Sequence, residues 1–330
     1  MIITKSPFRV SFVGGGSDLP SFYNHDIGAV LSVSINKYIY ISSHKFFSPD
    51  QVRLKYSQTE TIEKISDIKH PIFKEVLKKF NINGALEISS NADIPSGSGL
   101  GSSSSFTANL LLNHYVRENK FITKEQLAQE ACDIEMNKLK EPIGKQDHYA
   151  AVYGGLNVIV FKPSGEVDVE PLFIKEKTKK TLESRLLLFY TGSQRSASAI
   201  LDQQRKEMSN SKKRDIVKQM VELVWECKKV LYEDNLEKFG SLLAQNWELK
   251  KQLTDRISNN DINELVERGL SAGATGAKLL GAGESGFLLF YCDEKYQHKL
   301  RSELVELREL PFNFENKGAR LIYYGDEEKN

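Results

Sequence analysis

Residues 93–105 read DIPSGSGLGSSSS, a glycine- and serine-rich turn that follows a predicted strand and opens a predicted helix. The first turn of a helix presents free backbone N–H groups at the positive end of the helix dipole, so it attracts anions. Gly97, Gly99 and Gly101 permit positive φ and let the backbone approach an anion closely. The alternative interpretation is a flexible loop before a serine-capped helix. The pattern favours a phosphate-binding turn, although it is not a P-loop, because no lysine follows its last glycine.

The opening segment carries a fixed cation and a short acid beside a second glycine turn. Residues 7–20 read PFRVSFVGGGSDLP and end the first predicted strand. Arg9 stands on that strand and Asp18 follows the turn, so the two side chains could face one cleft. Taken alone, an arginine and an aspartate near a turn are usually surface residues.

A third glycine-rich segment lies near the end of the chain. Residues 278–290 read KLLGAGESGFLLF, in which Gly281, Gly283 and Gly286 satisfy the pattern GxGxxG. A dinucleotide-binding turn needs a helix after these glycines, whereas an apolar strand pattern follows here. A protein-kinase glycine loop is also excluded, because the chain contains no HRD or DFG sequence.

The predicted elements form an α+β protein of two domains. Strands are expected at 2–13, 29–43, 51–56, 85–90 and 156–161, and helices at 73–80, 103–117 and 124–136. A strand from residue 186 then leads into a helical region at about 197–270, and strands return at 277–280, 286–292 and 319–324 around a helix at 294–306. The simplest division places one domain at residues 1–180 and the other at 181–330.

Composition excludes several classes of protein. The 45 basic and 44 acidic residues leave a formal charge of +1, without the basic excess typical of nucleic-acid binding. The 3 cysteines have no CxxC spacing, so neither a disulfide framework nor a zinc site is indicated. No apolar run reaches the length of a membrane span, so we expect a cytoplasmic protein without nucleic-acid or membrane partners.

Two carboxylates, Glu135 and Asp147, follow the serine-rich turn along the chain. Glu135 lies near the end of a predicted helix, which Pro142 and Gly144 must interrupt before Asp147. One helix therefore does not carry both carboxylates, but a turn between them could aim both into a cleft. The alternative for Asp147 is a cap at the start of a short helix over residues 148–153.

The string PSGSGLGSSSS resembles the second motif of the GHMP kinases, and the segments at 7–20 and 278–290 resemble the first and third motifs in the right order. The resemblance implies an ATP-dependent kinase that uses Mg²⁺. It also implies an N-terminal domain similar to ribosomal protein S5 domain 2, a ferredoxin-like C-terminal domain, and a cleft between them.

The same resemblance implies a role for each motif residue. Asp147 and Arg9 would form the catalytic pair, with Asp147 taking or orienting the acceptor proton and Arg9 offsetting developing charge. Ser103 and Glu135 would bind Mg²⁺. The ATP phosphates would contact Pro95, Gly97, Ser98, Gly99, Leu100, Gly101, Ser102, Ser103 and Ser104.

Within this family the segments RVSFVGGGSDLPSFY, GKQDHYAAVYGG and YTGSQRSASAI are most similar to bacterial D-glycero-D-manno-heptose 7-phosphate kinases. This similarity implies phosphorylation of the anomeric hydroxyl to give the 1,7-bisphosphate, for nucleotide-activated heptose. The expected substrate-binding residues are Gly15, Gly16, Ser17, Asp18, Gly192, Arg195, Gly281 and Gly283. Arg195 and Lys145 are candidates for the substrate's own phosphate, and the alternative for both is a solvent-exposed charge.

Other assignments within the same fold stay open. They are a fucose-type sugar 1-kinase, a kinase of the mevalonate route, and a catalytically inactive binding protein. A homodimer is compatible with all of them.

Overall fold

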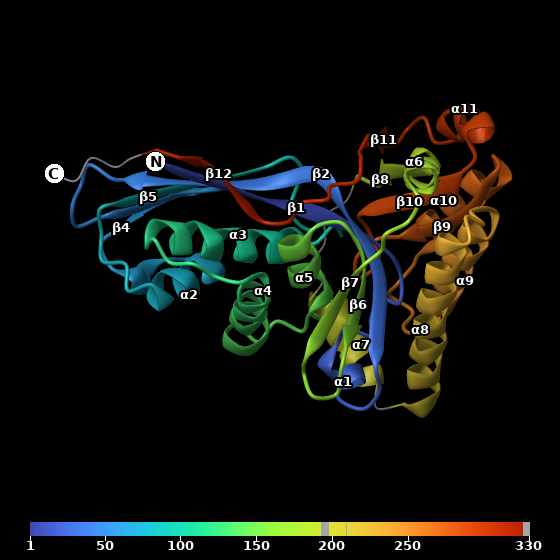
Figure 1. Cartoon of the computed structure of the whole chain (residues 1–330), viewed down its shortest axis with the longest axis horizontal. Coiled ribbons are helices and arrows are strands. Elements are labelled where there is room, and N and C mark those ends of the chain that lie inside the picture. Colours follow the sequence, from blue (N-terminus) through green and yellow to red (C-terminus); the bar gives the residue numbers. More distant parts are fainter. Residues whose placement is uncertain (193–197, 209, 326–330) are drawn as a thin grey trace.

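The computed structural model of the chain describes residues 1–192, 198–208 and 210–325, and Figure 1 shows its helices and strands. The first elements are β1 (Ile2–Val13), α1 (Pro20–Tyr23), β2 (Gly28–Lys45), β3 (Val52–Lys55), β4 (Thr59–Ile62), η1 (Ile65–Asp67), α2 (Pro71–Lys79), β5 (Leu86–Ala92), α3 (Ser102–Arg117), α4 (Lys124–Cys132), the π-helical turn η2 (Asp133–Lys138), α5 (Gln146–Tyr153), β6 (Leu156–Phe161) and β7 (Val167–Pro171). They are followed by α6 (Glu176–Ser184), β8 (Leu186–Tyr190), α7 (Ser198–Glu207), α8 (Ser211–Tyr232), α9 (Glu237–Lys251), α10 (Asn260–Ser271), β9 (Ala274–Leu279), β10 (Phe287–Cys292), α11 (Glu294–Glu303), β11 (Arg308–Glu309) and β12 (Arg320–Tyr324). The predicted α+β architecture with two sheets is confirmed.

The first sheet is built around two long antiparallel strands, β1 and β2. Its order is β12-β1-β2-β5-β3-β4, and β6 pairs with both β2 and β7. Residues 28–33 of β2 pair with β6, whereas residues 39–45 pair with β5, so one strand serves two parts of the sheet. Side chains such as Val10 and Phe12 are fully buried. Strand β1 therefore carries the glycine turn that follows it into the interior of the molecule.

Helix α3 is held on this sheet by two buried asparagines. The side-chain amide of Asn109 donates to the carbonyl of Ile39 at 3.0 Å, and that of Asn113 donates to the carbonyl of Ile41 at 3.2 Å. Helix α3 lies beneath the sheet in Figure 1 and contacts both β1 and β2. These bonds fix the position of the helix along β2, and with it the position of the serine-rich first turn.

The second sheet is a smaller antiparallel sheet in the order β11-β8-β10-β9. Its central strands read LLLFY and FLLFYC, and nearly all of their residues are buried. Helix α9 packs against β9, and α8 contacts both α9 and β2. Helix α8 therefore connects the second sheet to the first.

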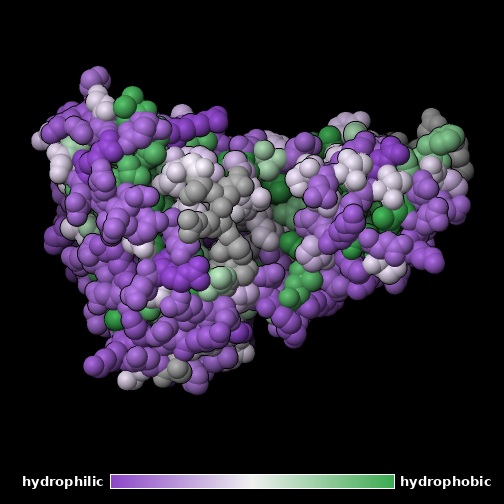
Figure 2. Space-filling view, turned by 180° about the vertical axis from the view of Figure 1, so that it is seen from behind, coloured by the Kyte–Doolittle hydropathy of each residue, from purple (hydrophilic) through white to green (hydrophobic). Residues whose placement is uncertain are grey.

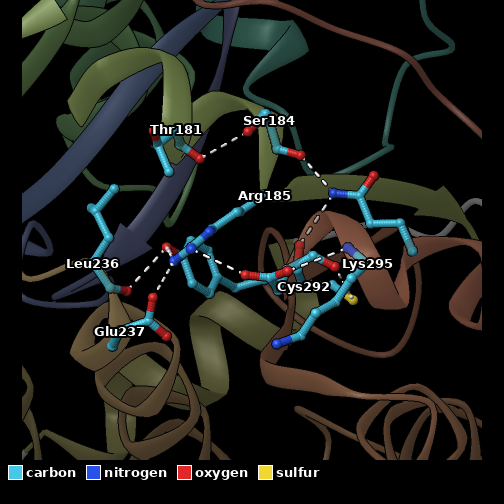
Figure 3. Close-up of polar contacts among 10 residues, drawn as sticks. Thr181, Ser184, Arg185, Leu236, Glu237, Cys292 and Lys295 are labelled. Atoms are coloured by element: carbon cyan, nitrogen blue, oxygen red, sulfur yellow. Dashed lines mark hydrogen bonds and ion pairs between the residues drawn. The ribbon is translucent and has the colours of Figure 1, made fainter. Parts of the chain in front are cut away.

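Arg185, between α6 and β8, ties the second sheet to its helices (Figure 3). Its guanidinium donates to Glu237 at 2.9 Å, to the Tyr291 hydroxyl at 3.4 Å and to Asp293 at 3.1 Å. The Tyr291 hydroxyl in turn donates to the carbonyl of Leu236 at 3.0 Å. These contacts fix the beginnings of α9 and α11, and the other end of α9 reaches the cavity described below.

The last strand is placed differently from the expectation. The sequence pattern assigns residues 319–324 to the second domain, but β12 pairs with β1 in the first sheet, with Ile2 opposite Tyr324. The residues of a strand do not specify which other strand it pairs with, so this long-range pairing could not be predicted from residues 319–324 alone. We therefore propose a boundary near residue 180, with the final strand returning to the first domain.

The surface is mostly hydrophilic on the face shown in Figure 2. Within residues 1–192, 198–208 and 210–325, no helix has both the length and the apolar character needed to cross a membrane. Cys132, Cys227 and Cys292 are buried free thiols.

Candidate active site

The three glycine-rich segments, far apart in the sequence, meet at one cavity. Its walls come from the end of β1 and the turn after it, the serine-rich turn with the start of α3, and the start of α5. Helices α7 and α9 and the loop between β9 and β10 supply the remaining wall. Elements of both sheets therefore contribute to a single site.

Arg9 and Asp147 form a bidentate ion pair in this cavity. Arg9 Nε donates to Asp147 Oδ1 and Arg9 Nη2 donates to Asp147 Oδ2, each at 2.6 Å. The remaining nitrogen, Nη1, donates to the carbonyl of Gly99 at 2.8 Å. Only 4% of Arg9 is exposed, so the guanidinium is fixed between the carboxylate and the serine-rich turn. A planar fork of this kind holds both partners in one orientation.

Asp18 lies in the wall formed by the first glycine turn. Its carboxylate accepts hydrogen bonds from the backbone N–H of Gly16 at 3.0 Å and from that of Gln146 at 3.3 Å. The second of these bonds caps the beginning of α5, so Asp18 also positions Asp147 in the first turn of that helix. Burial and the nearby charge of Asp147 raise the pKa of Asp18 above its ordinary value.

Asp147 does not cap α5 itself. The cap position of this helix is Lys145, and Asp147 lies within its first turn. The alternative interpretation of Asp147 as a helix cap is therefore wrong, because Asp18 fills that role from another part of the chain. Asp147 is left to face Arg9 and the cavity.

Glu135 is held behind the serine-rich turn by two polar contacts. Ser103 Oγ donates to Glu135 Oε2 at 2.5 Å, and His148 Nε2 lies 2.9 Å from Glu135 Oε1. The π-helical turn η2 carries Glu135, and such turns often aim side chains at functional sites. Burial raises the pKa of Glu135, but the hydrogen bond and charge of His148 and the hydroxyl of Ser103 lower it by more. The carboxyl group is therefore ionised.

Ser103 and Glu135 fit a magnesium ion that is shared with phosphates. Both supply hard oxygen ligands, and Mg²⁺ is usually bound by one or two protein groups together with phosphate oxygens and water. In the part of the chain that the structure describes, no group of three or more His, Cys, Asp or Glu side chains could hold a metal alone. The chain would thus hold Mg²⁺ only in partnership with phosphates on the serine-rich turn.

The serine-rich turn and the loop between β9 and β10 are packed backbone against backbone. A Cβ atom added at Gly281 would lie 2.6 Å from the Cα of Gly99, and one added at Gly99 would lie 2.5 Å from the carbonyl oxygen of Leu280. Both glycines have positive φ, at 84°. The contact therefore requires glycine at both positions, for space and for backbone conformation.

Replacing Gly281 with Ala is expected to raise the KM for ATP and lower thermal stability. Positive φ costs a residue with Cβ about 1–2 kcal/mol, and the new methyl group would also push Gly99 out of the phosphate-binding turn. Steady-state kinetics and thermal unfolding would measure the two effects. The matched control is Gly165→Ala, because Gly165 has φ of 88° but only the Lys145 ammonium lies near its added Cβ, at 3.9 Å. Equal KM values for ATP in both variants would show that the contact between the loops is dispensable.

The structure brings most of the predicted site residues to the cavity. Those that line it are Arg9, Gly15, Gly16, Asp18, Gly97, Gly99, Gly101, Ser102, Ser103, Ser104, Asp147, Gly281 and Gly283. Pro95 is exposed outside it, and Ser98 and Leu100 are buried behind the turn. Ser17 is also buried, with its hydroxyl bonded to the carbonyls of Gly14 and Ala29.

Two further residues considered from the sequence, Gly192 and Lys145, do not line the cavity. Gly192 is exposed and lies outside its walls, and Arg195 lies outside the described residues. The Lys145 ammonium donates to the carbonyl of Gly165 and lies 4.8 Å from the ring centre of Tyr23.

Sequence reasoning missed several polar residues of the cavity, four of them with long side chains. Lys250 and Lys278 are buried lysines, and Gln146 and Gln204 contribute amide groups. Oε1 of Gln146 and Nε2 of Gln204 are buried without a hydrogen-bond partner among the described residues. Lys278 belongs to the third glycine motif and could have been noticed there. Lys250 and Gln204 lie in helices without a local motif, so only the fold reveals them.

Two family models match the chain. The model of the "GHMP kinases N terminal domain" matches residues 68–155, and that of "GHMP kinases C terminal" matches residues 227–308. The first range contains the serine-rich turn and both carboxylates, and the second contains Lys250 and the third glycine motif.

Known proteins resemble this chain over nearly its whole length. A D-glycero-alpha-D-manno-heptose 7-phosphate kinase of Campylobacter jejuni is 28% identical over 97% of this chain and 98% of that protein. A galactokinase of Pyrococcus furiosus is 25% identical over 89% of each. The crystal structure of a D-glycero-D-manno-heptose 1-phosphate kinase from Bacteroides thetaiotaomicron shares the fold, with a TM-score of 0.81, 21% identity and coverage of 99% of this chain and 100% of that one. The chain therefore belongs to the GHMP kinases and is an ATP-dependent kinase, as its three glycine motifs predict.

Proposed function

We propose that this kinase transfers the γ-phosphoryl group of ATP to a sugar hydroxyl in the cavity between the two sheets. The observation that carries the proposal is the bidentate pair of Arg9 and Asp147, which faces the serine-rich turn. Phosphoryl transfer depends mostly on positioning and charge stabilisation, and a kinase needs a cation near the phosphates and a carboxylate near the nucleophile. Both groups are present, and each is fixed by its neighbours.

Asp147 is suited to take or orient the proton of the acceptor hydroxyl. A carboxylate offers about four lone-pair sites, and Arg9 uses one on each oxygen. The others are available to a hydroxyl, because Asp147 lines the cavity. Arg9 would offset the charge that develops on the transferring group. Mg²⁺ bound by Ser103 and Glu135 would neutralise charge on the ATP phosphates.

For the acceptor we propose D-glycero-D-manno-heptose 7-phosphate, phosphorylated on its anomeric hydroxyl to give the 1,7-bisphosphate. Support comes from the Campylobacter relative, whose name states this substrate and whose similarity covers 97% of this chain. Asp18, in the wall formed by the first glycine turn, would hold sugar hydroxyls. Arg195 stays the candidate for the phosphate that the substrate already carries.

Coupled ADP release with a panel of acceptors tests this proposal. We expect a kcat/KM for heptose 7-phosphate at least about 100-fold above that for fucose, galactose or mevalonate, because a site built for a charged group rejects analogues that lack it. The matched control is the same heptose after enzymatic removal of its 7-phosphate. Phosphorus NMR of the product would show whether the new phosphate is on the anomeric carbon.

Other outcomes of the panel point to other functions. Turnover of an unphosphorylated hexose alone would contradict the heptose assignment but leave a sugar kinase. Turnover of mevalonate alone would contradict the sugar as well. ATP binding without turnover of any acceptor would favour a binding protein on the same fold.

A further inference from the structure

Lys250 is a buried cation in the cavity to which the three motifs assign no role. It lies near the end of α9, is only 7% exposed, and its ammonium donates to the carbonyl of Gly281 at 2.5 Å. An ammonium has three donors, and no second acceptor binds this one in the part of the chain that the structure describes. Because Lys250 lines the cavity, its remaining donors are available to a ligand there.

Lys250 has a second buried lysine as its neighbour. The ammonium of Lys278, which is 2% exposed, donates to the carbonyls of Ser11 and Phe12, at 2.8 and 2.7 Å. Among the described residues, neither lysine forms an ion pair with a carboxylate, and Asp147 is already occupied by Arg9. Buried charges without counter-ions are costly. Burial and the charge of Arg9 lower the pKa of Lys250 to about 8, against the opposing effect of the Asp18 and Asp147 carboxylates. An anion in the cavity would relieve this cost.

The position of Lys250 indicates which anion it would meet. The serine-rich turn and the third glycine loop touch at Gly99 and Gly281. Arg9 holds the carbonyl of Gly99, and Lys250 holds the carbonyl of Gly281. The two cations therefore flank the contact between the loops, one from the first sheet and one from a helix of the second domain. Phosphates on the serine-rich turn would lie beside both.

We propose that Lys250 contacts the γ-phosphoryl group of ATP and stabilises its charge during transfer. The acceptor oxygen forms its bond to phosphorus while the bond to the β–γ bridging oxygen breaks, and the hydroxyl proton goes to Asp147. Charge in this transition state spreads over the three equatorial oxygens of the transferring group. Arg9 and Lys250 would bind different oxygens from opposite sides. The inference rests on the kinase function but not on which sugar accepts the phosphate.

Two substitutions separate the charge of Lys250 from its structural bond. Lys250→Met removes both the charge and the donor to Gly281, whereas Lys250→Gln removes the charge but keeps an N–H donor. We expect both variants to lower kcat about 100- to 1,000-fold, the usual loss for a fixed donor to a developing charge. The acceptor is whichever sugar the wild-type enzyme phosphorylates. The matched control is Lys251→Met, because Lys251 pairs with Glu248 at the surface and is expected to retain wild-type kcat.

A binding measurement without acceptor gives a second readout. Calorimetry would compare ADP with the non-hydrolysable analogue that carries an imido group between the β- and γ-phosphates. We expect both Lys250 variants to bind the analogue about 10- to 100-fold more weakly, because a charge-assisted hydrogen bond is lost. Their affinity for ADP should stay within about 2-fold of wild type. Since no sugar is present, a wrong assignment of the acceptor does not affect this test.

Three results would overturn the proposal. If Lys250→Gln keeps wild-type kcat while Lys250→Met loses it, the lysine only holds the loop at Gly281. If both variants raise the KM of a phosphorylated acceptor and leave kcat unchanged, Lys250 binds the acceptor's phosphate instead. If affinity for ADP falls as much as affinity for the analogue, the contact is not with the γ-phosphate. Thermal unfolding of each variant confirms that a folded protein is compared.

Discussion

Replacing Asp147 with Asn is expected to lower kcat about 100- to 10,000-fold while the affinity for ATP stays close to that of the wild type. The substitution keeps the size and one acceptor oxygen of the side chain but removes the charge that would attract the acceptor proton. It also presents an amide N–H₂ to Arg9, whose Nε and Nη2 both bond to Asp147 at 2.6 Å. Steady-state kinetics and calorimetry with ADP would measure the two quantities separately.

The control must separate proton transfer from the positioning of Arg9. In a double-mutant cycle with Arg9→Met, an Asp147 that only holds Arg9 would add nothing once Arg9 is gone. A direct role predicts that the double variant is slower than Arg9→Met alone. Asp168→Asn is the matched surface control. Asp168 lies on β7, pairs with Lys162 and does not line the cavity. Unchanged turnover of Asp147→Asn would remove this residue from the mechanism.

The parts of this fold that could be predicted from sequence are those with a local physical cause. A helix was expected to begin at residue 124, and the hydroxyl of the preceding Thr123 caps it by accepting a hydrogen bond from the N–H of Gln126 at 3.1 Å. The serine-rich turn lies between a strand and a helix as predicted, because glycine conformation and helix initiation act within a few residues. Strand β6 was predicted at its observed bounds from β-branched content and alternation.

What could not be predicted depends on contacts between distant segments. Strand β12 pairs with β1, more than 300 residues away in the sequence, and nothing in its own residues specifies this partner. Asp18 caps helix α5 across 128 positions. This contact gives Asp18 a structural role and leaves the Asp147 side chain to face the cavity. Lys250 reaches the cavity because α9 packs on the second sheet, although its helix carries no motif.

The glycine motifs occupy an intermediate position. Each predicts a turn by itself, but only the resemblance to a family predicts that the three meet. The second and third motifs meet through the packing of Gly99 against Gly281, which tolerates no side chain. The glycine pattern therefore predicted where another backbone segment can approach closely. Which segment does so depends on the fold.

Replacing Glu135 with Gln is expected to raise the Mg²⁺ concentration needed for half-maximal activity by at least about 10- to 100-fold, the loss usual when even a supporting group of a metal site is removed. Glutamine keeps the shape but loses the charge that makes Glu135 a hard ligand for Mg²⁺. It also disturbs the buried contacts with Ser103 and His148. We therefore expect a lower stability as well, by about 1–3 kcal/mol.

Because stability and metal binding both change in this variant, the control has to reproduce the first effect without the second. Glu130→Gln is such a control. Glu130 lies on helix α4, outside the cavity, and its two carboxylate oxygens accept from the Tyr115 hydroxyl at 2.9 and 2.8 Å. Activity at increasing Mg²⁺ and fixed ATP, together with Mg²⁺-dependent binding of ADP, would distinguish the two variants. If Glu135→Gln matched Glu130→Gln in both measurements, Glu135 would be a structural partner of His148. A shift confined to Glu135→Gln would instead mean that the pair with His148 serves to keep an ionised ligand beside Ser103, where the phosphates bind.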